Sequence, residues 1–199
     1  MKIIVVGGTG TIGQAVSEAL SERHEVVTVG LDSGHFRANI EDIQSIKSMY
    51  HEIGSFDALV ATTGQVIFKN TVEMTAEEYY VGLNSKLMGS VNLVLQGLSY
   101  INGGGSFTLT TGIINRDPIA LGSSAAMVNG GLEAFVKASA IELPKGIRIN
   151  AVSPTVIEEA LPAYGPYFRG FKAISAKDAA NYYVKSVEGL QTGQVYHAD

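Results

Sequence analysis

The sequence predicts a doubly wound α/β fold, in which a parallel sheet of about seven strands lies between two layers of helices. Two observations lead to this prediction. Short apolar runs alternate with segments of helical periodicity along the whole chain, as they do in consecutive βαβ units. The first apolar run, Ile3 to Val6, leads directly into a glycine-rich turn that opens a helix. We therefore expect a three-layer α/β/α sandwich that binds its ligands beyond the carboxyl ends of the strands.

The same alternation assigns each element in order. Strands are expected at 2–6, 25–29, near 36–40, and at 58–61, 106–110, 148–152 and 194–197. Helices are expected at 11–22, 41–53, 75–100, 123–143 and 176–188. Crossovers between parallel strands are right-handed, so helices should cover both faces of the sheet. The segment 154–175 is rich in proline and aromatic residues, which is typical of a loop that covers a site rather than of a linker.

Composition narrows the range of functions. The 199 residues, with no linker among them, predict a single dinucleotide-binding domain over residues 1–199. Lys and Arg number 14 against 19 Asp and Glu, without a basic cluster, so neither nucleic acid nor an anionic membrane is an expected partner. There is no cysteine, which excludes a thiol nucleophile and a disulfide framework. The first apolar run is too short for a signal peptide, and we expect a cytoplasmic protein.

The glycine-rich turn predicts a dinucleotide site of the Rossmann type. Gly7, Gly10 and Gly13 have the spacing G-x-x-G-x-x-G between the first strand and the first helix. Missing side chains allow a sharp turn and close approach of a pyrophosphate, and the helix N-terminus offers free N–H groups to it. A tight strand-to-helix turn without a ligand is the alternative interpretation. The expected cofactor contacts in this turn are Gly7, Thr9, Gly10, Thr11, Ile12 and Gly13.

The end of the second strand bears on the choice between NAD and NADP. An acidic side chain there would accept hydrogen bonds from the adenosine ribose and repel a 2′-phosphate. The usual acidic position falls on Gly30, and Asp32 lies two residues further on, near enough to reach the ribose. His35 and Arg37 could instead hold a 2′-phosphate. The sequence thus predicts NAD or NADP as cofactor, with a slight preference for NAD.

Five segments, in the right order, resemble the short-chain dehydrogenase/reductase family across essentially the whole chain. They are the Gly7–Gly13 turn, Ala61–Gly64 after the fourth strand, the helix residue Asn84, Arg148–Pro154, and Thr192–Tyr196. The glycine spacing is one residue shorter than the family's commonest form. The resemblance implies an oxidoreductase that acts on a small carbonyl or alcohol substrate. It also implies further cofactor contacts at Asn39 and Ile40 beside the adenine, and at Thr62, Thr63, Gly64, Pro154 and Val156.

The catalytic residues of that family are not all present. The family places a Tyr-x-x-x-Lys pair on the helix after the fifth strand, and the resemblance puts Ala125 and Asn129 at those two positions. Alanine has no proton to give, and an amide has no charge that could lower a neighbouring pKa. The family's serine corresponds to Thr111 or Gly112. Only Asn84 is plainly retained.

Two interpretations of this departure stay open. The reductase chemistry is lost, which leaves a nucleotide-binding regulatory or scaffold protein, or the proton donor has moved. Tyr164 is the substitute acid that we name, and Tyr167, Lys86, Ser123 and Ser124 are further candidates. Each has an alternative. The tyrosines could serve packing, the serines could cap the long helix, and Lys86 is expected to be solvated, since two helical positions turn it some 200° from Asn84. The predicted catalytic set is Asn84, Thr111 and Tyr164.

Metal chemistry and phosphotransfer have no support in the sequence. His24, His51 and His197 lack the spacing of metal ligands, and no Walker-type lysine follows the glycine turn. Small residues on the long helix would allow another helix to approach closely, at Ala125, Ala126, Gly130 and Gly131. The family commonly pairs these helices between subunits, so the resemblance implies a homodimer or homotetramer.

Overall fold

Seven parallel strands form the central sheet of the computed structural model, which describes residues 1–199. They are β1 (Lys2–Val6), β2 (Glu25–Gly30), β3 (Phe36–Arg37), β4 (Phe56–Ala61), β5 (Ile101–Thr110), β6 (Arg148–Pro154) and β7 (Val195–Ala198). Their order in the sheet is β3-β2-β1-β4-β5-β6-β7, and every neighbouring pair is parallel. The order runs outward in both directions from β1, as in a doubly wound sheet. The predicted fold class is confirmed.

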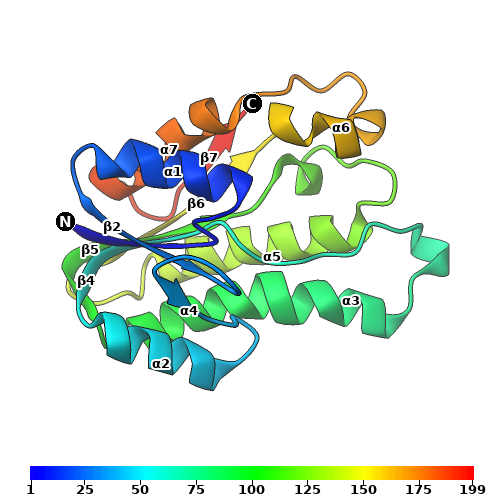
Figure 1. Cartoon of the computed structure of the whole chain (residues 1–199). Helices are drawn as coiled ribbons and strands as arrows, with labels where there is room; N and C mark the ends of the chain where they lie inside the picture. Colours follow the sequence, from blue (N-terminus) through cyan, green and yellow to red (C-terminus); the bar gives the residue numbers. More distant parts are fainter.

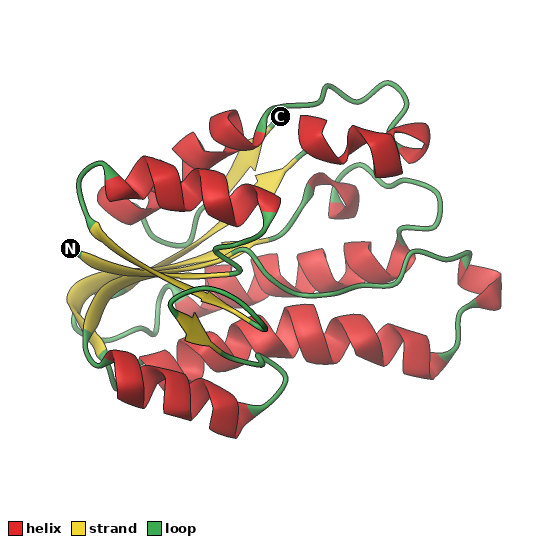
Figure 2. Ribbon diagram, in the orientation of Figure 1, coloured by secondary structure: helices red, strands yellow, loops and turns green.

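Helices cover both faces of the sheet (Figures 1 and 2). One face carries α1 (Thr11–Ser21) and α7 (Ala176–Glu188), and the other carries α2 (Ile43–Ile53), α4 (Gly89–Gly97) and α5 (Ser123–Ser139). Two apolar cores of 24 and 16 buried residues lie on the two sides. Successive strand residues divide between them, with Ile4 in one core and Ile3 in the other, because side chains alternate along a strand. None of the helices is both long and apolar enough to span a bilayer.

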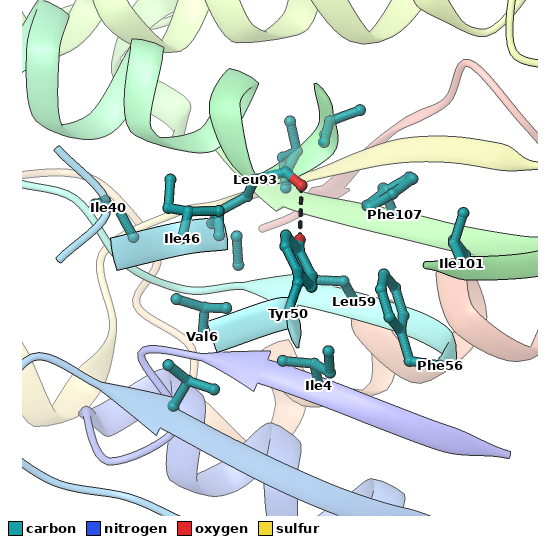
Figure 3. Packing of buried hydrophobic residues seen from close by; sticks show 14 of the residues in the cluster. Ile4, Val6, Ile40, Ile46, Tyr50, Phe56, Leu59, Leu93, Ile101 and Phe107 are labelled. Atoms are coloured by element: carbon teal, nitrogen blue, oxygen red, sulfur yellow. Dashed lines mark hydrogen bonds between the residues drawn. The ribbon is translucent and has the colours of Figure 1, made fainter. Parts of the chain in front are cut away.

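Tyr50 shows how the larger core accommodates a polar atom. Its side chain is fully buried, and its ring stacks on Phe56 at a centroid distance of 5.5 Å. The hydroxyl donates a hydrogen bond of 2.6 Å to the carbonyl oxygen of Leu93 on α4 (Figure 3). A buried hydroxyl without a partner would destabilise the fold, so this bond fixes α2 against α4.

The helical segment expected at 75–100 is present but not regular. It consists of α3 (Ala76–Gly82), a π-helix at Leu83–Met88 and α4, which follow one another without a break. A capping box at Thr75 and Glu78 begins it, because each side chain accepts a hydrogen bond from the other residue's backbone. The π-helix has wider turns and rotates the side chains that follow it relative to a regular helix. Such π-turns often occur at functional sites.

The remaining boundaries differ from the predictions by a few residues. Helix α2 begins at Ile43 because the side chain of Asp42 accepts a hydrogen bond from the backbone of Gln44 and caps it. The short connecting helices are η1 (Thr71–Glu73), η3 (Ile113–Asn115), η4 (Glu158–Ala160), α6 (Leu161–Tyr164) and η5 (Gly165–Tyr167). The last three lie in the segment expected to cover the site. A parallel bridge between Ile157 and Ile174, outside the sheet, joins the two ends of this segment.

Candidate functional site: a cleft along the carboxyl ends of the strands

The glycine turn after β1 leaves room for a ligand and fixes the start of α1. Gly7 has φ +82°, and a Cβ there would lie 2.7 Å from the carbonyl oxygen of Thr62 after β4. A Cβ on Gly13 would overlap the carbonyl oxygen of Gly7, so this glycine lets α1 pack onto the turn. A Cβ on Gly10 would meet only the Gly7 oxygen, at 3.4 Å, and otherwise faces open space. The turn is therefore closed behind Gly7 and Gly13 and open at Gly10.

The N-terminus of α1 presents unpaired backbone donors to that open space. No side chain caps the helix, and its N-cap residue is Gly10. Along α1, the N–H group of Gln14 is the first that has a backbone acceptor, and it donates to the carbonyl oxygen of Gly10. The N–H groups of Thr11, Ile12 and Gly13 are left without acceptors, at the positive end of the helix dipole. This is the arrangement that binds phosphate groups.

On one side of this turn lies a pocket of about 130 Å³. Its walls come from the ends of β1, β2 and β4 and include the predicted residues Gly7, Asn39, Ile40, Thr63 and Gly64. Asp32 is exposed and does not line the pocket, whereas the neighbouring Gly30 and Leu31 do. The hydroxyl of Ser33 donates a hydrogen bond of 2.9 Å to that of Thr9, which holds the loop after β2 beside the glycine turn.

On the other side lies a second pocket of about 240 Å³, beyond the ends of β5 and β6. Its lining is mostly apolar and includes Ile12, Val66, Phe68, Ile113, Ile114, Ala125, Ile157 and Phe168. The polar lining residues are Lys86, Thr110, Thr111, Asn129 and Thr155. Parallel strands end at the same edge of a sheet, so both pockets open along that edge. The first lies at the ends of β2, β1 and β4 and includes Gly7 of the glycine turn, and the second lies toward β5 and β6 and includes Ile12 of α1, so the N-terminus of α1 adjoins both.

Lys86 is the largest correction to the sequence analysis, which expected it to be solvated. It lies in the π-helix, is partly buried and lines the second pocket. Gly64 allows this close approach, because a Cβ there would lie 2.6 Å from the Cα of Lys86. The Nζ atom donates a hydrogen bond of 3.1 Å to the carbonyl oxygen of Thr111. Burial lowers the pKa of Lys86 to about 8.

Asn84 and Lys86 face different sides of the helix, as expected, but Asn84 was expected to face the site and Lys86 to face solvent, and the structure shows the opposite. Asn84 is exposed and does not line the pocket, whereas Lys86 does. The buried neighbour Ser85 accepts a hydrogen bond of 3.1 Å from the backbone of Gln65, which ties the π-helix to the loop after β4. The structure thus brings a lysine, and not the predicted asparagine, to the site.

The two residues of α5 that differ from the family's Tyr-x-x-x-Lys pair, Ala125 and Asn129, face the second pocket. Ala125 and Asn129 are one turn apart, each is 2% exposed, and both line the pocket. The amide nitrogen of Asn129 is 3.4 Å from the carbonyl oxygen of Gly112, and its amide oxygen is buried without any partner. The hydroxyl of Thr155, after β6, is likewise buried without a partner. Buried polar atoms of this kind are typical of sites that bind a ligand.

Thr111 lines the pocket as predicted, but its proton is already engaged. Its hydroxyl donates a hydrogen bond of 3.2 Å to the carboxylate of Glu133, a residue that is only 8% exposed. A threonine hydroxyl has one proton, so Thr111 cannot donate to a substrate oxygen while it keeps this hydrogen bond. Glu133 was not predicted from the sequence as a site residue, although it lies one further turn along α5 from Asn129 and shares its face.

The other candidates lie at the margin of the site. Tyr164 is 41% exposed, does not line the pocket, and rests its ring on Phe68 at 5.6 Å. Tyr167 is 45% exposed. Ser123 does not cap α5, because Gly122 is the N-cap residue, and its hydroxyl pairs instead with that of Tyr79 at 2.9 Å. Of the remaining predicted contacts, Pro154 lines the second pocket. Val156 is buried but does not line it.

Comparison with known proteins identifies relatives over almost the whole chain. The family model described as enoyl-(acyl carrier protein) reductase matches residues 8–192. A tropinone reductase homologue of Arabidopsis thaliana is 26% identical over 86% of this chain and 74% of its own length. A short-chain dehydrogenase/reductase of Acremonium sp. is 22% identical over 78% of this chain and 72% of its own length.

Solved structures agree with the fold in detail. The crystal structure of the protein lin1944 from Listeria innocua is 48% identical, covers both chains fully and gives a TM-score of 0.99. The crystal structure of a small-chain dehydrogenase in complex with NADPH is 28% identical, with a TM-score of 0.89, over all of this chain and 96% of that one. These matches confirm the resemblance drawn from the sequence, and the chain belongs to the short-chain dehydrogenase/reductase family.

Proposed function

We propose that this protein binds a nicotinamide dinucleotide along the carboxyl edge of its sheet and uses it to interconvert a small carbonyl compound and the corresponding alcohol. One observation carries the proposal. The unpaired N–H groups at the start of α1 lie between two pockets, so that a pyrophosphate held there could extend into both. Membership of an oxidoreductase family and the relative solved with NADPH support the same activity.

The residues of both pockets fit such a ligand. Asn39 and Ile40 would hold the adenine, and the N–H groups of Thr11 and Ile12 would hold the pyrophosphate. The unpartnered amide oxygen of Asn129 would accept a hydrogen bond at the other end. When bound, the dinucleotide supplies or accepts the hydride. The apolar walls of the second pocket would exclude water from the reacting atoms and receive the uncharged part of the substrate.

The structure favours a choice of cofactor different from the one that Asp32 suggested. Neither Asp32 nor Arg37 lines the pocket of about 130 Å³, but Arg37 is paired in register with Gly30, which does line it, and forms no ion pair. The hydroxyls of Thr9 and Ser33 lie at the same end of β2. An unpaired guanidinium group and two hydroxyls near the end of one strand are groups that would suit a 2′-phosphate. We therefore propose NADP(H), in line with the relative solved with NADPH.

Replacing Gly10 tests the dinucleotide site. A Val side chain at this open position would occupy the space of the pyrophosphate without striking the fold, so Gly10→Val should unfold cooperatively but lose NADPH affinity. Gly130→Ala, on α5 where a Cβ meets nothing within 4 Å, is the matched control and should bind as the wild type does. Fluorescence titration with NADPH measures both. Equal affinities for the Gly10 variant and the wild type would exclude this site.

Replacing Arg37 tests the choice of cofactor. Arg37→Ala should weaken NADPH binding by about tenfold, the effect of losing one charge-assisted hydrogen bond, and leave NADH binding unchanged. Asp32→Ala serves as the comparison, since removal of its negative charge should favour NADPH if it acts on the site at all. Tighter binding of NADH than of NADPH by the wild type would refute the proposal and restore the preference suggested by Asp32.

A regulatory or scaffold protein without turnover is the second candidate function. The observation that favours it is the pair Ala125 and Asn129, which occupies the wall where the family's acid and its lysine would be. Both candidates predict NADPH binding. They differ in whether the wild type oxidises NADPH in the presence of carbonyl compounds, so an assay of that reaction decides between them.

A further inference from the structure

Lys86 is a partly buried cation that forms no ion pair. The ion pairs of the structure do not include it, and its hydrogen bond is the one from Nζ to the carbonyl oxygen of Thr111. An ammonium group has three protons to donate, so two stay available toward the pocket. Burying a charge with so few partners is costly unless a ligand completes its environment. The position of Lys86 therefore points to a ligand oxygen.

None of the side chains that line the pocket with Lys86 is a suitable proton donor, so Lys86 is the only candidate for a general acid there. Among the residues that line the pocket, Lys86 is the only one with an ionisable side chain. From α5, Ala125 and Asn129 contribute no acidic proton, and the carboxylate of Glu133 is held by the Thr111 hydroxyl. The hydroxyl of Thr110 donates to the carbonyl oxygen of Ala61 on the neighbouring strand. From the covering segment, Phe168 is the residue that reaches the pocket, while Tyr164 does not line it.

We propose that Lys86 is the catalytic acid and base of this protein, in place of the tyrosine that Ala125 has replaced. The inference rests on the proposed function. In the reductive direction the carbonyl carbon gains a hydride from the reduced nicotinamide and forms a C–H bond. The electron pair released to the carbonyl oxygen takes a proton from Nζ of Lys86, which leaves a neutral amine and an alcohol. Water then returns the proton to Nζ, and oxidation of the alcohol follows the reverse course.

Two features suit Lys86 to this role. Its pKa, lowered to about 8 by burial, lies near neutral pH, where a group can both give and take a proton efficiently. Its position is also fixed on both sides, by the close approach of Gly64 and by the bond to Thr111. The mostly apolar pocket around this one cation indicates a small, largely apolar ketone or aldehyde as the substrate class.

Amine labelling tests the inference without any knowledge of the substrate. Acylation of the lysines across a pH series, read by mass spectrometry, should show Lys86 titrating near pH 8, and saturating NADPH should protect it. The exposed Lys47 on α2 is the internal control, and NADPH should not protect it from acylation. A Lys86 whose acylation does not change near pH 8, or that NADPH does not protect, would overturn the proposal.

Kinetics separate the proposed role from a structural one. With a panel of apolar ketones and aldehydes, Lys86→Met should lose about 10²–10⁴-fold in kcat but keep its NADPH affinity. Lys86→Arg should be inactive too, since it keeps the charge but does not give up a proton. Wild-type kcat/KM for reduction should fall above about pH 8, and the control Lys47→Met should match the wild type.

The outcomes also separate this inference from the function on which it rests. Turnover that survives in Lys86→Met, or a large loss of NADPH affinity in that variant, would overturn the role of Lys86 and leave the proposed function standing. A wild type that binds NADPH yet reduces no carbonyl would overturn the proposed oxidoreductase activity, and the role of Lys86 with it, but not the cofactor site. A wild type that does not bind NADPH would overturn the cofactor site itself.

Discussion

The partly buried ammonium group of Lys86 destabilises the folded protein, and the same burial gives the side chain a pKa suited to the proposed proton transfer. Its pKa falls from an ordinary value of 10.5 to about 8 because burial disfavours the ammonium form. The folded state therefore binds a proton at this residue less tightly than the unfolded state does. Residues that lower the stability of the folded state in this way are often found at functional sites, because activity requires groups that stability alone would not favour.

This cost gives the first residue-scale prediction. Below about pH 8 both states carry the charge and the full penalty is present; between about pH 8 and 10.5 the folded state loses its proton first, so stability rises with pH. Lys86→Met should therefore be more stable than the wild type near neutral pH, by about 1–3 kcal/mol after the lost bond to Thr111 is set against the gain. The difference should shrink as the pH approaches 10.5.

Urea unfolding at a series of pH values measures this difference. Lys47→Met removes a lysine that is exposed on α2, and its stability should follow the wild type at every pH. A Lys86→Met protein that is less stable than the wild type near neutral pH would show that the ammonium group is well satisfied in the folded state. That result would remove the reason to expect a ligand at Lys86.

At the residue scale the sequence predicted the glycines of the turn but not the lysine. Gly7, Gly10 and Gly13 could be predicted because their spacing follows directly from the needs of the turn. Lys86 could not, because its inward position depends on the missing side chain of Gly64, which is distant in sequence. Spacing along the helix separated it correctly from Asn84 but did not say which of the two faces inward.

At the scale of elements, α5 and the π-helix form the wall where the chemistry has changed. Ala125, Asn129 and Glu133 follow one another at intervals of one turn along α5, and Lys86 faces the same pocket from the π-helix. A lysine placed on α5 would thus share the pocket with Lys86. Two ammonium groups in one partly buried site repel each other, so only one of the two arrangements is stable.

This geometry predicts the outcome of rebuilding the family's pair. The double substitution Ala125→Tyr with Asn129→Lys should give little generic reductase activity, because the introduced ammonium group would meet that of Lys86. Adding Lys86→Asn should raise carbonyl-dependent oxidation of NADPH above that of the double variant, by about 10²-fold or more if general acid catalysis is restored. Absorbance of NADPH follows the reaction. Equal activity of the double and triple variants would mean that the two positions do not interact.

The strands and the longer helices could be predicted from apolar periodicity, and most boundaries are correct within a few residues. The π-helix could not, since the spacing of apolar residues in 75–100 fits a regular helix and nothing local marks the extra residue in its turn. The pairing of Thr111 with Glu133 was missed for a related reason. The hydrogen bond joins a strand end to a helix residue 22 positions away, and only the packing of α5 on β6 and on η3, which follows β5, brings them together.

On the scale of the whole molecule, one surface carries exposed apolar side chains on neighbouring helices. A shallow hollow between α3 and α5 is lined by Ala76, Tyr79, Tyr80, Leu83, Ser123 and Met127, of which Tyr80 is 56% and Met127 43% exposed. Adjoining exposed apolar residues are a mark of protein interfaces. These helices include the long helix whose small residues suggested pairing between subunits, and we propose that this face joins two copies of the chain.

A charge on that face should separate the subunits. Met127→Glu should convert a dimer to a monomer in light scattering after size exclusion, because an unpaired carboxylate would be buried in the interface. Leu190→Glu is the matched control: Leu190 is 92% exposed and lies beyond α7, so its replacement should leave the mass unchanged. A wild type that is monomeric, or a Met127→Glu protein that stays dimeric, would contradict the assignment of this face.

The overall architecture could be predicted from the sequence because strand and helix alternation, right-handed crossovers and the glycine turn all agree with one fold class, and the observed sheet order belongs to it. The cofactor end of the site could be predicted from that architecture, because the carboxyl ends of parallel strands lie at the same edge of the sheet. The catalytic end does not, because it depends on single side chains whose neighbours are set by tertiary packing.

A crystal structure of the protein with NADPH is the most direct test of the proposed site. The predicted result places the adenine beside Asn39 and Ile40, the pyrophosphate on the N–H groups at the start of α1, and the nicotinamide in the pocket of Lys86 and Asn129. Nζ of Lys86 should then lie within about 3–4 Å of the position open to a substrate oxygen. A nicotinamide bound outside that pocket, or a dinucleotide that makes no contact with the N-terminus of α1, would contradict it.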